Sequence, residues 1–172
     1  AFQNSQSPEM NQNQDNQNSW GYWADRIQNE NNISKIDQDI TNSTNSSLQL
    51  TDTTYIQNQI DSTQTQLLTF NGTFSGNNVT DSGSITLNFE IGYGNSNVSG
   101  NYQFGYNMVP YNGDLSGGSI YPSNGQMFFE AMNYDTRVEG QFYGSTMNSI
   151  SGTLNNFDIN NPDASVNFSA NR

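Results

Sequence analysis

The chain has 172 residues, a formal net charge of −12, and no cysteine or histidine. Its four basic residues, against 16 acidic ones, offer no basic surface for nucleic acid or for an anionic membrane. The missing Cys and His exclude disulfides, thiolate nucleophiles and imidazole chemistry, and remove the usual ligands of structural zinc. No apolar run approaches the roughly 20 residues of a membrane-spanning helix. We therefore expect no nucleic-acid partner and no membrane insertion.

Composition favours a small β-domain. The hydrophobic fraction is only 31%, whereas aromatic residues reach 12%. A sheet with one buried face needs fewer apolar residues than an α/β core does. The lack of cysteine and the start at Ala1 rather than Met suit a bacterial chain that has lost a signal segment or is a fragment. We expect an extracellular or outer cell-surface location.

Residues 1–19 are predicted to be an Asn- and Gln-rich N-terminal arm. This segment has almost no apolar content, with Phe2 as an exception. Its composition is typical of a disordered tail, and also of segments that stack as β-structure. Because the arm has little of its own to bury, we expect it to contact a neighbouring molecule, with Phe2 as a candidate interaction residue.

Residues 20–64 are predicted to be an aromatic anchor and a short helical linker. The anchor is Trp20-Gly21-Tyr22-Trp23, which places three aromatic side chains around one glycine. Trp20, Tyr22 and Trp23 can pack the N-terminal segment against the rest of the domain, since these side chains bury large areas. The alternative is a platform for a sugar or a protein partner.

Two groups of isoleucines have helical spacing within the linker. Ile33, Ile36 and Ile40 fall on one helical face, and Ile56 and Ile60 are one turn apart. We expect one or two short helices, stabilised by docking rather than by intrinsic propensity.

From about residue 65 the hydrophobic period switches to two, and residues 65–172 are predicted to be a β-barrel. One pattern recurs, in which a large residue, a spacer, a glycine, a spacer and another large residue follow each other. It occurs at Phe70–Phe74, Val98–Tyr102, Val138–Phe142 and Ile150–Leu154. Alternate residues of a strand share a face, so each glycine lies between two large residues on the buried side. Such glycines mark bends or close backbone approach, which a small curved barrel requires.

Eight strands are predicted, at 66–75, 83–93, 96–106, 115–121, 125–133, 136–144, 147–156 and 163–170. The intervening turns are predicted at 76–78, 94–95, 112–114, 124–125 and 160–163, where Gly, Asn, Asp and Pro gather. Short turns imply antiparallel neighbours. The predicted fold class is therefore mainly β, a single antiparallel eight-stranded up-and-down barrel with a polar arm and one or two short helices.

For one hairpin the sequence predicts which residues pair across the two strands. A two-residue loop at 134–135 pairs residues that share the core face, namely Ala131 with Val138, Phe129 with Gly140 and Met127 with Phe142.

The same register places Glu130 opposite Glu139 on the outer face, with Arg137 on the diagonal. Neighbouring carboxylates are the arrangement of a glycosidase pair. The alternative is a structural group of three charges on the outer face, Glu130, Arg137 and Glu139, in which Arg137 neutralises the carboxylates. We call this group the charged rung. We adopt the second interpretation and expect no catalytic residue and no enzymatic activity.

Two polar turns offer hard oxygen ligands of the kind that calcium prefers. They are Asp158–Asp163 and Asn112–Asp114. Neither has the ordered spacing of an EF-hand loop. We expect ordinary turn residues, no cofactor and no metal, with calcium as the alternative.

Three motifs resemble the barrel domain of transferrin-binding-protein-B-like surface proteins of Gram-negative bacteria. Gly140–Gly144 reads GQFYG, which matches a late-strand signature of that family, and Val166–Arg172 is similar to its closing strand, with Asn167 where glycine is commoner. Some large surface proteins with such a barrel carry a W-G-Y-W segment ahead of it, as Trp20–Trp23 does here. The resemblance implies surface display, protein–protein binding and no catalysis.

Three hypotheses for function follow. The first is a non-catalytic extracellular barrel whose arm docks onto a neighbouring copy, giving a fibre, a surface layer or an adhesive subunit. The second is a monomeric surface receptor lobe that binds a host or environmental protein. The third is a carbohydrate-binding module that uses Trp20, Tyr22 and Trp23.

Overall fold

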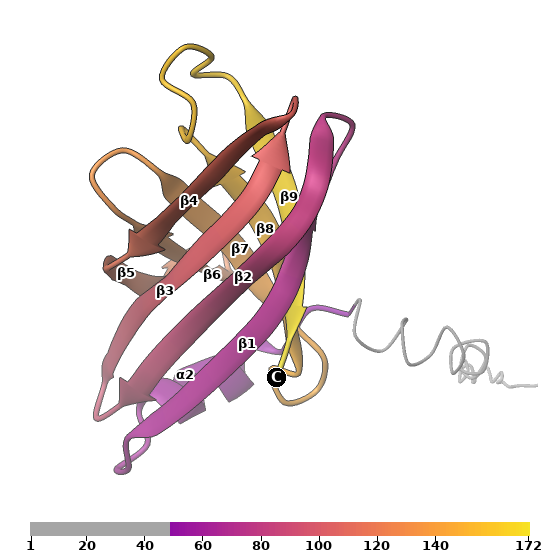
Figure 1. Cartoon of the computed structure of the whole chain (residues 1–172). Coiled ribbons are helices and arrows are strands. Elements are labelled where there is room, and N and C mark those ends of the chain that lie inside the picture. Colours follow the sequence, from indigo (N-terminus) through magenta and orange to yellow (C-terminus); the bar gives the residue numbers. More distant parts are fainter. Residues whose placement is uncertain (1–48) are drawn as a thin grey trace, which may run out of the picture. The chain divides into compact units, whose positions relative to one another are not determined.

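The computed structural model describes residues 49–172, which form one curled antiparallel sheet and a short helix (Figure 1). The elements of this part are α2 (Thr53–Ile60), β1 (Gln66–Ser75), β2 (Val79–Gly92), β3 (Asn95–Tyr106), β4 (Val109–Leu115), β5 (Gly117–Ser123), β6 (Gln126–Met132), β7 (Arg137–Tyr143), β8 (Ser149–Asn155) and β9 (Ser165–Asn171). The mainly β, barrel-like class expected from the sequence is confirmed.

The strand order is β4-β3-β2-β1-β9-β8-β7-β6-β5, and every pair is antiparallel. The first strand pairs with the last, as an up-and-down arrangement requires. Figure 1 shows β1 to β4 on one side of the domain and β5 to β9 behind them. The two edge strands, β4 and β5, are consecutive in the sequence.

The predicted count of eight strands differs from the nine observed, because β4 was missed. The predicted turn at Asn112–Asp114 was wrong, since these residues lie in β4. The turn before β4 is Asn107-Met108, with φ of 52° and 68°. Methionine is not a typical residue for this backbone region, and Pro110 breaks the strand pattern at a position that an edge strand tolerates.

β4 and β5 together occupy the place of one strand along β3. β4 pairs with β3 as far as Gly100 and Leu115, and after Ser116 the chain pairs with β6 instead. Beside β5, the Ser96 hydroxyl accepts a hydrogen bond from the Ile120 amide at 2.9 Å and donates one to the Ile120 carbonyl at 3.5 Å. The Ser96 side chain therefore joins β3 to β5, beyond the point where the backbone ladder between β3 and β4 ends.

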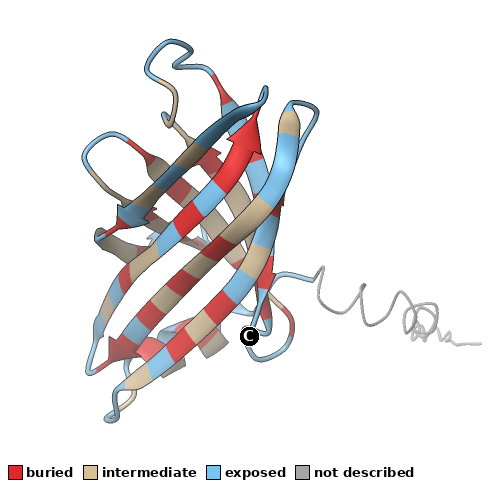
Figure 2. Ribbon diagram, viewed as in Figure 1, coloured by how far each residue is buried: buried red, intermediate tan, exposed pale blue. Residues whose placement is uncertain are grey.

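The core is filled by the inward side chains of the sheet, and burial alternates along the strands (Figure 2). Phe89 is fully buried, and its ring centroid lies 5.0 Å from those of Phe129 and Phe142 and 5.4 Å from that of Phe70. Between residues 49 and 172 no charged side chain is buried. The interior is thus an aromatic and aliphatic core.

Inward glycines allow neighbouring strands to approach closely, as the repeated pattern predicted. A Cβ on Gly72 would collide with the Ser169 carbonyl oxygen and lie 2.5 Å from the Ala170 Cα. Gly140 and Gly152 pair directly across β7 and β8, and a Cβ on Gly152 would lie 2.7 Å from the Gly140 Cα. A methyl group at these positions has no room.

Helix α2 covers one end of the sheet. Its N-cap is Asp52, whose carboxylate accepts a hydrogen bond from the Thr54 amide at 2.8 Å. Ile56 and Ile60, the pair predicted to lie one turn apart, are both buried in the core. The Gly94 amide in the β2–β3 turn bonds the Ile60 carbonyl at 2.9 Å, which fastens the helix to the sheet.

Aromatic side chains fill the opposite end. Phe157, in the loop between β8 and β9, lies 5.0 Å from Phe104, 5.1 Å from Tyr106 and 4.9 Å from Tyr111, in edge-on arrangements between ring centroids. Such edge-on pairs add stabilisation beyond the area that they bury.

Candidate functional site

The four candidate interaction residues, Phe2, Trp20, Tyr22 and Trp23, lie outside the described residues. The arm at 1–19 and the helical spacing at Ile33–Ile40 lie there too. These assignments stay predictions, and the candidate site is built from residues 49–172.

Glu130, Arg137 and Glu139 form the charged rung predicted on the outer face. Arg137 Nη2 lies 2.7 Å from Glu130 Oε1 and 3.5 Å from Glu139 Oε1, and all three side chains are partly exposed. The hydrogen bond to Glu130 raises the pKa of Arg137, and burial opposes this rise. One guanidinium thus holds both carboxylates, and exposed pairs of this kind contribute at most about 1 kcal/mol to stability.

The hairpin register around this rung is confirmed. Phe129 pairs with Gly140, and Ala131 pairs with Val138. Met127 and Phe142 are both buried on the core face, but they fall beyond the last ladder pair.

The residues just before α2 pair with the end of β7. Leu50 bridges Tyr143, and the Thr51 amide bonds the Phe142 carbonyl at 2.9 Å. The segment ahead of the helix therefore borders the end of β7.

Asp158 begins an ordinary Asx turn. Its carboxylate accepts a hydrogen bond from the Asn160 amide at 3.0 Å, and its carbonyl accepts one from the Asn161 amide at 3.1 Å. Within the part of the chain that the structure describes, no group of three or more acidic side chains is placed to hold a metal ion.

Tyr111 is expected to make stability fall at alkaline pH. Burial raises its pKa, and the neighbouring Asp158 carboxylate raises it further. Above the ordinary tyrosine pKa of about 10, the unfolded chain loses this proton while the folded chain keeps it. The free energy of unfolding therefore decreases as pH rises through that window, and the contribution is fully present below about pH 10. Urea unfolding on both sides of this pH measures the decrease, and Tyr111→Phe should make it shallower. An identical decrease in the variant would contradict the assignment.

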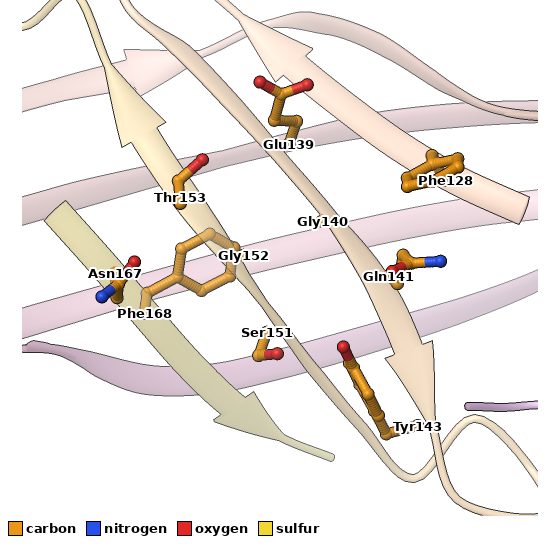
Figure 3. Close-up of a pocket in the computed structure, with 10 residues that line it drawn as sticks. All are labelled: Phe128, Glu139, Gly140, Gln141, Tyr143, Ser151, Gly152, Thr153, Asn167 and Phe168. Carbon is orange, nitrogen blue, oxygen red and sulfur yellow. The ribbon is translucent and has the colours of Figure 1, made fainter. Parts of the chain in front are cut away.

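A hollow of about 390 Å³ lies on the outer face of β6 to β9 (Figure 3). Two rows of outward side chains border it. Glu139, Thr153 and Asn167 are paired neighbours in one row, and Gln141 and Ser151 are paired in the next.

Between the rows, β7 and β8 both carry glycine. Gly140 and Gly152 form the floor, so the backbone itself is exposed to the hollow. Figure 3 shows Phe128 and Asn167 on opposite sides of these glycines, with Glu139 and Tyr143 towards opposite ends. The same two glycines that let the strands approach thus shape the outer surface.

Some outward polar side chains of the sheet pair with a neighbour, and within the hollow Gln141 does so with Gln126 at 3.1 Å. On β1 and β2, Thr69 bonds Asn88 at 2.7 Å and Thr86 bonds Asn71 at 2.8 Å. In the hollow, the side chains of Tyr143, Ser151, Thr153 and Asn167 form no hydrogen bond with any other described residue. Their donors and acceptors are therefore available to a ligand.

This hollow was not predicted from the sequence. The pattern at Val138–Phe142 predicts which residues face the core, and the outward residues between them have the composition of ordinary polar surface. The signal that could have found it is the pairing of two glycine patterns on adjacent strands, because the outward residues that flank them then form two parallel rows.

Each of the two sheet edges has features that disfavour an added strand. In a two-residue hairpin, the residues that flank the turn exchange both hydrogen bonds, and the next residue points its backbone outward. At β4 and β5 that next residue is Pro110 and Pro122, which have no N–H to donate. Further along the edges, Asn133 bonds the Asp114 carbonyl at 3.0 Å, and Ser96 bonds Ile120. Docking by strand addition is therefore disfavoured at both edges.

No model of a known protein family, no curated protein and no solved structure matches this chain. None of the helices in residues 49–172 has the length and apolar character needed to cross a membrane.

Proposed function

We propose that this chain is a non-catalytic extracellular or cell-surface protein that makes protein–protein contacts and builds a fibre, surface layer or adhesive assembly from copies of itself. The observation that carries the proposal is the distribution of exposed apolar side chains in the described domain. They lie at its two ends. Leu50, Leu67 and Tyr93 are near α2, whereas Met108, Tyr134 and Ile159 are in the turns at the opposite end and Val109 is the first residue of β4 beside them.

The apolar side chains in the turns at the end opposite α2 are more exposed than those near α2. Tyr134 is 101% exposed, Ile159 89% and Met108 84%. Since Pro110 and Pro122 disfavour strand addition at the sheet edges, the proposed contact between copies runs through the ends or through the N-terminal arm. Contacts that join two different surfaces repeat from copy to copy, and they produce a filament where the rotation does not close into a ring.

The alternative is a monomeric receptor lobe that binds another protein, as the family resemblance implies. The same apolar turns would then contact the foreign partner. The mass of the particle in solution distinguishes the two proposals.

Deletion of residues 1–18 is expected to reduce assembly to the monomer. Light scattering of the full chain should give a mass that rises with concentration above the 19.1 kDa of one chain, and electron microscopy should show elongated particles. Ile159→Asp should also reduce the mass, because it places a charge on an exposed apolar end. Thr73→Asp, at an exposed polar position of β1, is the matched control. A full chain that stays monomeric at every concentration would favour the receptor lobe.

A further inference from the structure

We propose that the outer hollow on β6 to β9 binds a short, uncharged saccharide. The inference is independent of the proposed function, since it concerns the wall of the domain and not its ends. The volume of about 390 Å³ lies within the range of small-molecule sites, about 300–1,000 Å³.

The chemistry of the lining matches a sugar ring. A pyranose has apolar C–H faces and hydroxyl groups at its edge, so it requires an aromatic surface together with groups that both donate and accept hydrogen bonds. Phe128 and Tyr143 are half-buried outward aromatics at the border of the hollow, and Tyr121 stacks on Phe128 with ring centroids 6.0 Å apart. Ser151, Thr153 and Asn167 supply hydroxyl and amide groups that have no partner among the described residues.

The charges of the lining disfavour both anionic ligands and free cations. The lining contains no cationic side chain, so a phosphate, sulfate or uronate would find no partner there. Its one carboxylate, Glu139, already lies 3.5 Å from Arg137, which disfavours a free cation as the ligand. What remains is a neutral molecule rich in hydroxyl groups.

Two other hollows in the described part lack this combination. The one beside α2 is lined by Thr53, Gln57 and Met127 with no aromatic side chain, and the one on β3 and β4 borders Tyr102, whose hydroxyl lies 3.2 Å from the Thr136 hydroxyl in the core. The hollow on β6 to β9 joins outward aromatic rings to unpaired polar groups, and these two hollows do not.

The test is a titration of the full chain, labelled with ¹⁵N, followed by amide chemical shifts. The probes are cellotetraose, chitotetraose, maltotetraose and xylotetraose at about 10 mM, enough to fill a millimolar site. At least one probe should shift the amides of Gly140, Gln141, Ser151 and Gly152, whereas a tetragalacturonate should not.

Two variants then locate the site. Tyr143→Ala and Asn167→Ala should each weaken binding about ten-fold, which corresponds to about 1.4 kcal/mol. Thr69→Ala, on the polar wall of β1, should bind as the unaltered chain does. Asn167 is exposed, so its variant keeps the fold if Tyr143→Ala does not.

The inference is overturned if no neutral probe moves the amides of the hollow. It is equally overturned if the shifts are confined to Trp20–Trp23, because binding would then belong to the aromatic segment, or if both variants bind normally. None of these outcomes bears on the scattering experiment, so the two proposals can fail separately.

Discussion

Gly72→Ala is expected to lower the free energy of unfolding by about 3 kcal/mol, because the new methyl group meets the backbone of β9. The Ser169 carbonyl and the Ala170 Cα occupy the space into which the Cβ would point, and neither can move without opening the ladder between β1 and β9. Thermal unfolding should show a decrease in Tm of about 10 °C.

The matched control is Gly117→Ala on β5. A Cβ there meets nothing within 4 Å, and its φ does not require glycine. The control should change the free energy of unfolding by no more than about 0.5 kcal/mol. Equal losses in the two variants would show that close backbone approach is not the reason for the inward glycines.

Phe89→Ala is expected to cost about 4 kcal/mol, since it removes the ring at the centre of the core. Phe70, Phe129 and Phe142 all contact this ring. Phe70 comes from β1 and the other two come from β6 and β7, so the contacts join the two layers of the curled sheet, β1 to β4 and β5 to β9. No neighbouring side chain can fill the cavity without giving up its own contacts. Urea unfolding measures the loss.

Tyr134→Ala is the control for this variant, because Tyr134 is 101% exposed in the β6–β7 loop. It removes a large aromatic side chain without opening a cavity, so the unfolding midpoint should stay unchanged. A loss below about 1 kcal/mol in Phe89→Ala would mean that the two layers do not share one core.

Much of the fold could be predicted because the two-residue period is a local property of the sequence. β1 was predicted with its observed bounds, and the register of Phe129 with Gly140 followed from a short loop and the requirement that apolar residues share a face. β4 could not be predicted in this way. Pro110, Asn112 and Gly113 are turn residues by local chemistry, and only their position at a sheet edge explains why they form a strand.

Less of the candidate site than of the fold could be predicted from the sequence. The charged rung of Glu130, Arg137 and Glu139 was predicted, because it depends on one hairpin. The hollow depends on four strands in correct register, and on which polar side chains are already paired. Asn167 and Phe128 are about 40 residues apart in the chain, and nothing local links them.

The pairing of β1 with β9 has a consequence for how this domain folds. Every other ladder joins strands that follow each other in the chain, so it can form as an independent hairpin at small entropic cost. Joining β1 to β9 brings together the first and last strands of the sequence, about 90 residues apart, and this closure removes much of the conformational freedom that the chain still has. We expect this step to limit the folding rate, so substitutions at the β1–β9 ladder should slow refolding in stopped-flow measurements.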